Sequence, residues 1–133
     1  ISVTSGIAIN SKKKIFCFDG DGALTMHMGS LTTSATQNNI VHIVFNNYGH
    51  ESVGGQKTSA NNVHFYKLAK TLGYKFSRSC KNKTDLKKAI SDSILSKGSF
   101  FIEILCKQGH RKNISRPNTK MINLKNQFMK NLK

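Results

Sequence analysis

Two short polar signatures contain the residue types with which this chain could carry out chemistry. Gly20-Asp21-Gly22 closely follows the apolar run 15–18, and Asn46-Asn47 directly follows the apolar run 40–45. Glycine on both sides of Asp21 lets an anion approach the main chain closely. A strand that ends here and opens a helix would point backbone N–H groups at a phosphate. The first signature therefore predicts a phosphate-binding site.

A phosphate group beside Asp21 needs a cation between the two negative charges. Mg²⁺ prefers hard oxygen ligands and commonly bridges a carboxylate to phosphate oxygens in octahedral geometry. Ligands of open α/β sheets bind at the carboxyl ends of the strands, where Asn47 could supply an amide oxygen and Gly49 a main-chain oxygen. Two diphosphate oxygens and a water would complete the octahedron. Asp21, Asn47 and Gly49 are therefore the predicted metal ligands.

The stretches around these signatures alternate between short apolar runs and longer amphipathic segments. Wholly apolar runs of this length are typical of strands buried on both faces of a parallel sheet. Leu24, Met28, Leu31 and Ala35 recur at the spacing of one helix face, and Thr84 is placed to cap a later helix. Strands are expected at 15–18, 40–45, 74–78 and 100–106, and helices at 1–10, 24–35, 61–72, 84–98 and 121–132.

This alternation predicts an α/β fold, a doubly wound parallel sheet with flanking helices. We expect one domain over residues 1–107, cut within its first helix, and a basic tail with a terminal helix over 108–133. No stretch reaches the roughly 18 consecutive apolar residues of a membrane span. Three widely spaced cysteines give neither metal-ligand spacing nor a disulfide framework. They indicate buried thiols in a reducing cytoplasm.

The net charge of +15 raises the question of nucleic-acid binding. The lysines are spread along the chain, however, and no aromatic side chains interleave with them to form a stacking platform. Nucleic acid is therefore an improbable partner. The charge would instead steer anionic substrates toward the chain.

The chemistry-bearing stretch resembles a known family. GDGALTMHMGSL and VHIVFNNYGHESVGGQ contain the thiamine-diphosphate motif, GDG with NN some 26 residues later, and look like the C-terminal cofactor-binding domain of phosphonopyruvate decarboxylase and its sulfopyruvate decarboxylase relatives. The likeness continues through GYKFSRSCKNKTDLKKAI, FFIEIL and QGHRKNISRP, so it covers nearly the whole chain. It implies the thiamine-diphosphate-binding fold of the PP type.

The resemblance also assigns cofactors and site residues. Thiamine diphosphate and Mg²⁺ are the implied cofactors, with Asp21, Asn47 and Gly49 around the metal. The loop 50–56 would approach the reacting end of the cofactor, and its candidate catalytic residues are His50 and Ser52. The residues implied in cofactor binding are Gly20, Gly22, Ala23, Leu24, Asn47 and Gly49. The family commonly has Gly-Ala at positions 48–49 and Asp at position 51; the second change leaves the role of Glu51 open.

The implied reaction is decarboxylation of an anionic 2-oxo acid, in which the cofactor ring serves as electron sink. Phosphonopyruvate would give phosphonoacetaldehyde and CO₂; the motif does not choose between it and sulfopyruvate. Such enzymes build the active site between two domains, often across a dimer. A pyrimidine-binding domain or subunit would supply the activating glutamate. We therefore expect a homo-oligomer and no turnover by this chain alone.

Other functional interpretations compete with this one. FDGDGAL also resembles the motif of haloacid-dehalogenase-type phosphatases, with Asp19 as nucleophile and Asp21 as general acid, but the later acidic residues form no metal-binding pair. Ala23 at the third ligand position excludes an EF-hand. A non-catalytic cofactor-binding fragment and a basic nucleic-acid binder remain alternatives. His42 and His64 are interpreted as structural, His27 is equally divided between structure and site, and Arg111 and Arg116 match basic positions of the family tail.

Overall fold

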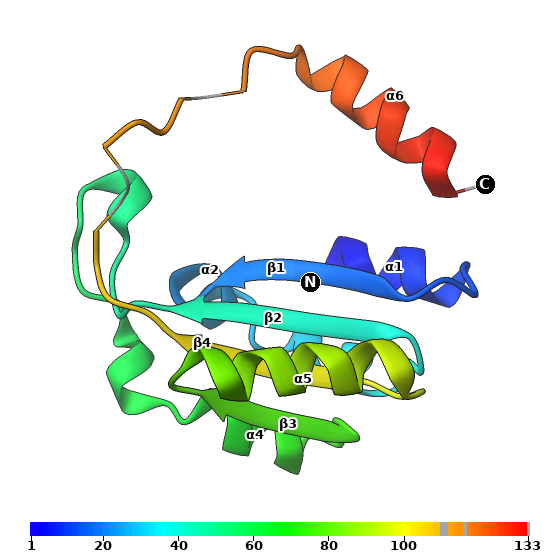
Figure 1. Ribbon diagram of the computed structural model, residues 1–133, viewed down its shortest axis with the longest axis horizontal. Helices are drawn as coiled ribbons and strands as arrows, with labels where there is room; N and C mark the ends of the chain where they lie inside the picture. Colours follow the sequence, from blue (N-terminus) through cyan, green and yellow to red (C-terminus); the bar gives the residue numbers. More distant parts are fainter. Residues whose placement is uncertain (110–111, 116, 133) are drawn as a thin grey trace.

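The computed structural model describes residues 1–109, 112–115 and 117–132, and a four-stranded parallel sheet forms its centre (Figure 1). The strand order is β1-β2-β4-β3. The strands are β1 (Ile15–Gly20), β2 (Ile40–Asn46), β3 (Phe76–Cys80) and β4 (Phe100–Leu105). Gly20 pairs with Phe45, and Asn46 pairs with Leu105. The carboxyl ends of three strands therefore meet at one edge of the sheet.

Helices cover both faces of the sheet, which confirms the expected α/β architecture. On one face, α2 (Asp21–Met26), α3 (Ser30–Ala35) and α4 (Phe65–Thr71) enclose a core with Val44 and Phe101. On the other face, α5 (Lys83–Leu95) packs over the apolar side chains of β2, β3 and β4. The remaining elements are α1 (Ser2–Ile9), α6 (Met121–Leu132) and the 3₁₀ turns η1 (Glu51–Val53) and η2 (Ser59–Asn62).

The single helix expected over 24–35 is wrong in detail, because two short helices stand in its place. Backbone bonds from His27 to Leu24 and from Ser30 to His27, both 3.0 Å, tighten the chain between α2 and α3. Bonds that span three residues do not continue an α-helix. The apolar face persists, since Leu24, Leu31 and Ala35 are all buried. Periodicity identified the inward side chains correctly but did not reveal the break.

The start of α5 also differs from the expectation. Asn82, not Thr84, is the N-cap, and its side-chain oxygen accepts a hydrogen bond from the backbone of Asp85 at 2.9 Å. Asparagine is a strong N-cap because its amide oxygen reaches the unpaired N–H groups of the first turn. At the other end Ile94, expected on the inner face, is 59% exposed. The helix therefore begins earlier than expected, and it ends at Leu95, before the expected end at 98.

The terminal helix α6 forms where it was expected and stands apart from the sheet (Figure 1). None of its residues is buried, although it carries six large apolar side chains, five of them exposed. The Lys13 Nζ donates a hydrogen bond to the Asn131 carbonyl oxygen at 2.7 Å. Arg111 and Arg116 lie outside the described residues. Within the described chain, every helix is too short or too polar to cross a lipid bilayer.

Candidate functional site

A cleft of about 410 Å³ lies at the carboxyl edge of the sheet, between the ends of β1, β2 and β4. It brings both polar signatures together, as the strand register requires. Eight of the nine predicted site residues line it: Gly20, Asp21, Gly22, Ala23, Asn47, Gly49, His50 and Ser52. Leu24 does not, because its side chain is fully buried in the core. Only the backbone of Leu24 could approach a ligand.

Asp21 opens α2 directly after the last residue of β1. Its side chain is almost fully buried, at 1% exposed, and its Oδ2 accepts a hydrogen bond of 2.5 Å from the Thr58 hydroxyl. Burying a carboxylate is costly unless it is paired or coordinates a metal. The Thr58 bond satisfies one oxygen and fixes the rotamer. The residue still borders the cleft.

The two asparagines of the second signature have different surroundings. The Asn46 side chain is 1% exposed and donates to the buried Glu103 carboxylate at 2.8 Å. Asn47, one residue later, borders the cleft, and its amide oxygen accepts a hydrogen bond from Gly49 N–H at 3.1 Å. Alternation along the strand explains the difference. Asn47, and not Asn46, is therefore the asparagine that lines the cleft.

The turn after Asn47 presents the Gly49 main chain to the cleft. Tyr48 adopts φ 59°, the left-handed region that favours glycine, and glycine is what the resembled family commonly has at this position. Gly49 forms an isolated antiparallel bridge with Lys57, made by the hydrogen bonds of its neighbours. The Gly49 carbonyl oxygen has no hydrogen-bond donor among the described residues, and its role as a metal ligand stays a prediction.

The His50 ring lies very close to Gly22. A Cβ built at Gly22 would lie 2.5 Å from Cε1 and 2.6 Å from Nδ1 of the His50 ring. The imidazole thus rests directly against the first turn of α2. The structure therefore places His50 beside the expected diphosphate position.

Glu51 connects two walls of the cleft. Its Oε2 accepts a hydrogen bond from the Asn47 amide at 3.2 Å, and its Oε1 accepts one from the Gly109 N–H. The Asn47 amide group is consequently held from both ends, by Glu51 and by Gly49. Glu51 also lines the cleft, where its two hydrogen bonds connect Asn47 to Gly109.

Several cleft residues were not predicted from the sequence. Phe45, Cys106, Lys107 and Gly109 line the cleft, and Thr58 holds Asp21 from behind. Burial raises the pKa of the Cys106 thiol, and the nearby Asp21 charge raises it further. Residues 106 and 107 follow the end of β4, so the strand pattern could have signalled them. Thr58 carried no comparable signal.

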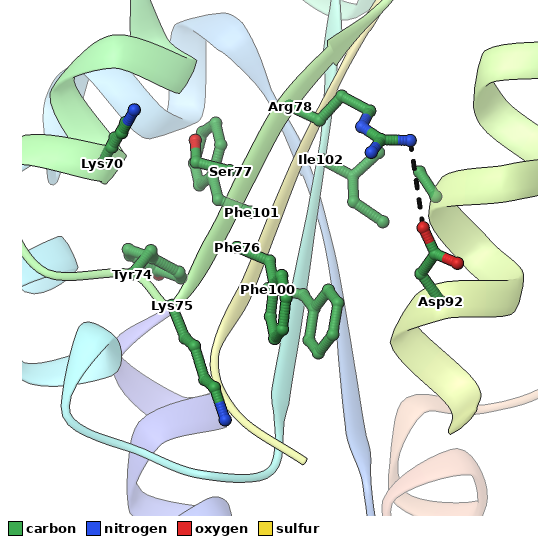
Figure 2. A pocket seen from close by; sticks show the side chains of 11 residues that line it. Lys70, Tyr74, Lys75, Phe76, Ser77, Arg78, Asp92, Phe100, Phe101 and Ile102 are labelled. Carbon is green, nitrogen blue, oxygen red and sulfur yellow. Dashed lines mark ion pairs between the residues drawn. The ribbon is translucent and has the colours of Figure 1, made fainter. Parts of the chain in front are cut away.

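A second cavity, of about 240 Å³, lies around β3, the outer strand of the sheet on the side away from β1 (Figure 2). The Phe76 and Phe100 rings stack there at 4.3 Å between centroids, and Arg78 faces Asp92 at 3.9 Å. None of the predicted site residues borders this cavity. The chemistry that the sequence indicates therefore belongs to the first cleft.

Comparisons with known proteins identify the family and the fold. Residues 1–104 match the family described as "Thiamine pyrophosphate enzyme, C-terminal TPP binding domain". The chain belongs to this family. The TPP-binding domain also matches a solved structure from Mycobacterium smegmatis described as a thiamin diphosphate-dependent enzyme. That match has a TM-score of 0.62 and 15% identity and covers 77% of this chain and 19% of the other, so it shows the fold alone.

Two curated relatives within this family are decarboxylases. Phosphonopyruvate decarboxylase of Streptomyces viridochromogenes is 30% identical over 87% of this TPP-binding domain, which spans only 30% of that protein. Sulfopyruvate decarboxylase subunit beta of Methanococcus maripaludis is 27% identical over 99% of this chain and 71% of the subunit. The resemblance seen in the sequence is confirmed at this level.

The donor set of the cleft fits a diphosphate with a hard divalent ion. A buried carboxylate, an amide group and a main-chain carbonyl oxygen without a hydrogen-bond donor are oxygen ligands of the kind that Mg²⁺ prefers. Gly20 leaves the main chain open beside them, whereas the His50 ring covers Gly22. Thiamine diphosphate follows from the family, and the donor set is compatible with Mg²⁺.

Proposed function

We propose that this chain is the diphosphate- and Mg²⁺-binding domain of a thiamine-diphosphate-dependent 2-oxo acid decarboxylase that acts on phosphonopyruvate. One observation carries the proposal: Asp21, Asn47 and the free carbonyl of Gly49 converge on a single cleft. The similarity to phosphonopyruvate decarboxylase supports the choice of substrate. Phosphonoacetaldehyde and CO₂ are the expected products.

The residues of the cleft divide the work of binding. The Asp21 carboxylate, the Asn47 amide oxygen and the Gly49 carbonyl would hold the metal. Backbone N–H groups at Gly22 and Ala23 would bind the diphosphate. Thr58 and Glu51 hold the side chains of Asp21 and Asn47 in place before the metal or the cofactor binds. This reduces the entropic cost of binding.

The reacting end of the site involves His50, Ser52 and Lys107. When bound, thiamine diphosphate supplies the nucleophilic carbon and the electron sink that decarboxylation of a 2-oxo acid requires. His50 can exchange a proton near the diphosphate, and Ser52 can donate a hydrogen bond from the cleft wall. Lys107, on the same wall, offers a positive charge to an anionic substrate.

A partner domain or subunit would complete the active site. The chain spans 30% of the length of its phosphonopyruvate decarboxylase relative, and other relatives are named as beta subunits. We propose that a pyrimidine-binding domain or subunit supplies the activating glutamate and that the assembly is a homo-oligomer of such units. Purified chain alone should release no aldehyde from phosphonopyruvate, and robust release would contradict this proposal.

Sulfopyruvate is the second candidate substrate. The relative that aligns over the greatest share of this chain, 99%, among those compared here is a sulfopyruvate decarboxylase beta subunit. Phosphonate and sulfonate are both tetrahedral anions, and Lys107 would attract either. With a complementing pyrimidine-binding subunit, kcat/KM for the two acids decides between them.

Calorimetry tests the binding function directly. Thiamine diphosphate should bind the chain only in the presence of Mg²⁺, and Asp21→Asn should abolish the metal-dependent part because it removes the charged ligand. Asp85→Asn, a change of the same kind on α5, serves as the matched control and should bind normally. Binding that ignores Mg²⁺, or that survives Asp21→Asn unchanged, would overturn the proposed site.

A further inference from the structure

Three possible metal ligands of different chemistry meet behind the cleft. Cys17 and Asp19 lie on the same side of β1, two residues apart, and Cys17 pairs in register with His42 of β2. One donor atom from each, a sulfur, a carboxylate oxygen and a ring nitrogen, lies within 4.8 Å of the other two. The proposed function uses none of these side chains. The cluster therefore needs its own explanation.

The His42 ring is held in one orientation. It is fully buried, and its Nε2 lies 3.4 Å from Asp19 Oδ2. On the other side Nδ1 lies 3.5 Å from the Tyr74 hydroxyl, which is 2.6 Å from Ser34 Oγ. Metal-binding histidines commonly use their second nitrogen in such a contact, which fixes the tautomer and the ring plane. The arrangement leaves Nε2 directed at the cluster.

We infer that Cys17, Asp19 and His42 form a binding site for a Zn²⁺-like ion. Zn²⁺ accepts sulfur, nitrogen and carboxylate ligands in tetrahedral geometry, with nitrogen and oxygen at about 2.0–2.2 Å. Two such ligands on one tetrahedral ion are separated by about the 3.4 Å seen between Nε2 and Oδ2. Mg²⁺ would not take this site, because it prefers oxygen ligands alone.

The ion would reach the site from the Asp19 side. The Asp19 side chain is 15% exposed, whereas Cys17 and His42 are buried. Water could complete the tetrahedron from the same direction. Binding would release the Cys17 thiol proton to solvent. The His42 proton would move from Nε2 to Nδ1, where it can be donated to the Tyr74 oxygen, so the imidazole stays neutral.

Such an ion would join β1 to β2 immediately behind Gly20 and Asp21. A ligand that binds only the folded chain raises the free energy of unfolding by mass action. The site is thus a structural metal centre that fixes the strand on which the cleft begins. It is independent of the proposed function, because it shares no ligand with the cleft.

Cobalt spectroscopy on the full chain tests the inference. Metal-free chain titrated with Co²⁺ should bind one equivalent and show a thiolate-to-cobalt charge-transfer band with the intense visible bands of tetrahedral cobalt. Zn²⁺ should displace the cobalt, remain bound after dialysis and raise the melting temperature. Cys17→Ser should remove the charge-transfer band. The near-isosteric Asp19→Asn should weaken binding by at least about tenfold.

Two control variants separate this site from the cleft. Asp21→Asn and His50→Ala remove cleft side chains and should leave the cobalt spectrum unchanged. Absence of a thiolate band in the wild-type chain would overturn the inference, as would metal retention unaffected by both Cys17→Ser and Asp19→Asn. Should Cys17→Ser fail to fold by circular dichroism, the wild-type spectrum and Asp19→Asn still decide the question.

Discussion

At the scale of single residues, the contact between Thr58 and Asp21 matters most for the cleft. Thr58→Val keeps the volume of the side chain but removes the donor, so a buried carboxylate loses its hydrogen bond. We expect a loss of about 1–3 kcal/mol in the free energy of unfolding and weaker Mg²⁺-dependent binding of thiamine diphosphate. Urea denaturation and calorimetry measure the two effects. Thr58→Ser retains the hydroxyl and should recover most of the binding; if it behaves like Val, the hydrogen bond is not the cause.

Because His50 lies so close to Gly22, the effect of Gly22→Ala on the free energy of unfolding should depend on whether the His50 side chain is present. Gly22→Ala in the wild-type chain must displace the imidazole, and overpacking of this kind costs about 1–3 kcal/mol. In a His50→Ala background the same change meets mainly Thr58 Cγ2, at 3.3 Å. Alanine also favours helix over glycine by about 1 kcal/mol. The change should then be neutral or stabilising in urea denaturation, and equal costs in the two backgrounds would refute the proposed clash.

Sequence patterns predicted some residues of the site better than others, for a physical reason. Asp21 and Asn47 directly follow strands, whose parallel alignment delivers them to one edge, and Gly49 follows two residues later in the turn. Thr58 and Glu51 act through side-chain hydrogen bonds within a folded loop. Their partners depend on how that loop closes, which periodicity does not encode.

At the scale of elements, the N-cap of α5 differs between the sequence-based expectation, Thr84, and the structure, Asn82. Asn82 caps the helix, while Thr84 lies inside its first turn and is exposed. Asn82→Ala should cost about 0.5–2 kcal/mol, and Thr84→Ala should change the free energy of unfolding by less than about 0.5 kcal/mol. Thermal denaturation of the two variants gives the comparison. A larger loss from Thr84→Ala would favour the cap first expected from the sequence.

The differences between expected and observed elements share one cause. Strands buried on both faces were located to within a residue or two, because their apolar runs are unambiguous, as for 40–45 and β2. The break between α2 and α3 and the cap of α5 depend on single hydrogen bonds. Several residues can make such bonds at neighbouring positions. Hydrophobic patterns therefore identify the layers, and local polar contacts set the boundaries.

At the scale of the whole molecule, α5 covers only part of its face of the sheet. Val41 and Ile43 lie in the core beneath it, whereas Phe18 on the outer strand β1 is 66% exposed and Phe45 is 43% exposed. Their rings lie 6.3 Å apart at 21°. An uncovered aromatic surface of this kind commonly marks an interaction site. The net charge of +15 opposes association of identical copies, since like charges repel.

These opposing terms predict self-association that depends on salt. Once salt screens the charge, the chain should associate through Phe18 in sedimentation velocity experiments, because burial of an aromatic side chain contributes about 1.5–3 kcal/mol. Phe18→Ser should therefore weaken association by at least about tenfold. Ile94→Ser, which changes an exposed apolar side chain on α5 instead, should have little effect. A wild-type chain that stays monomeric at high salt, or equal effects of the two variants, would show that the β1 aromatic surface does not drive association.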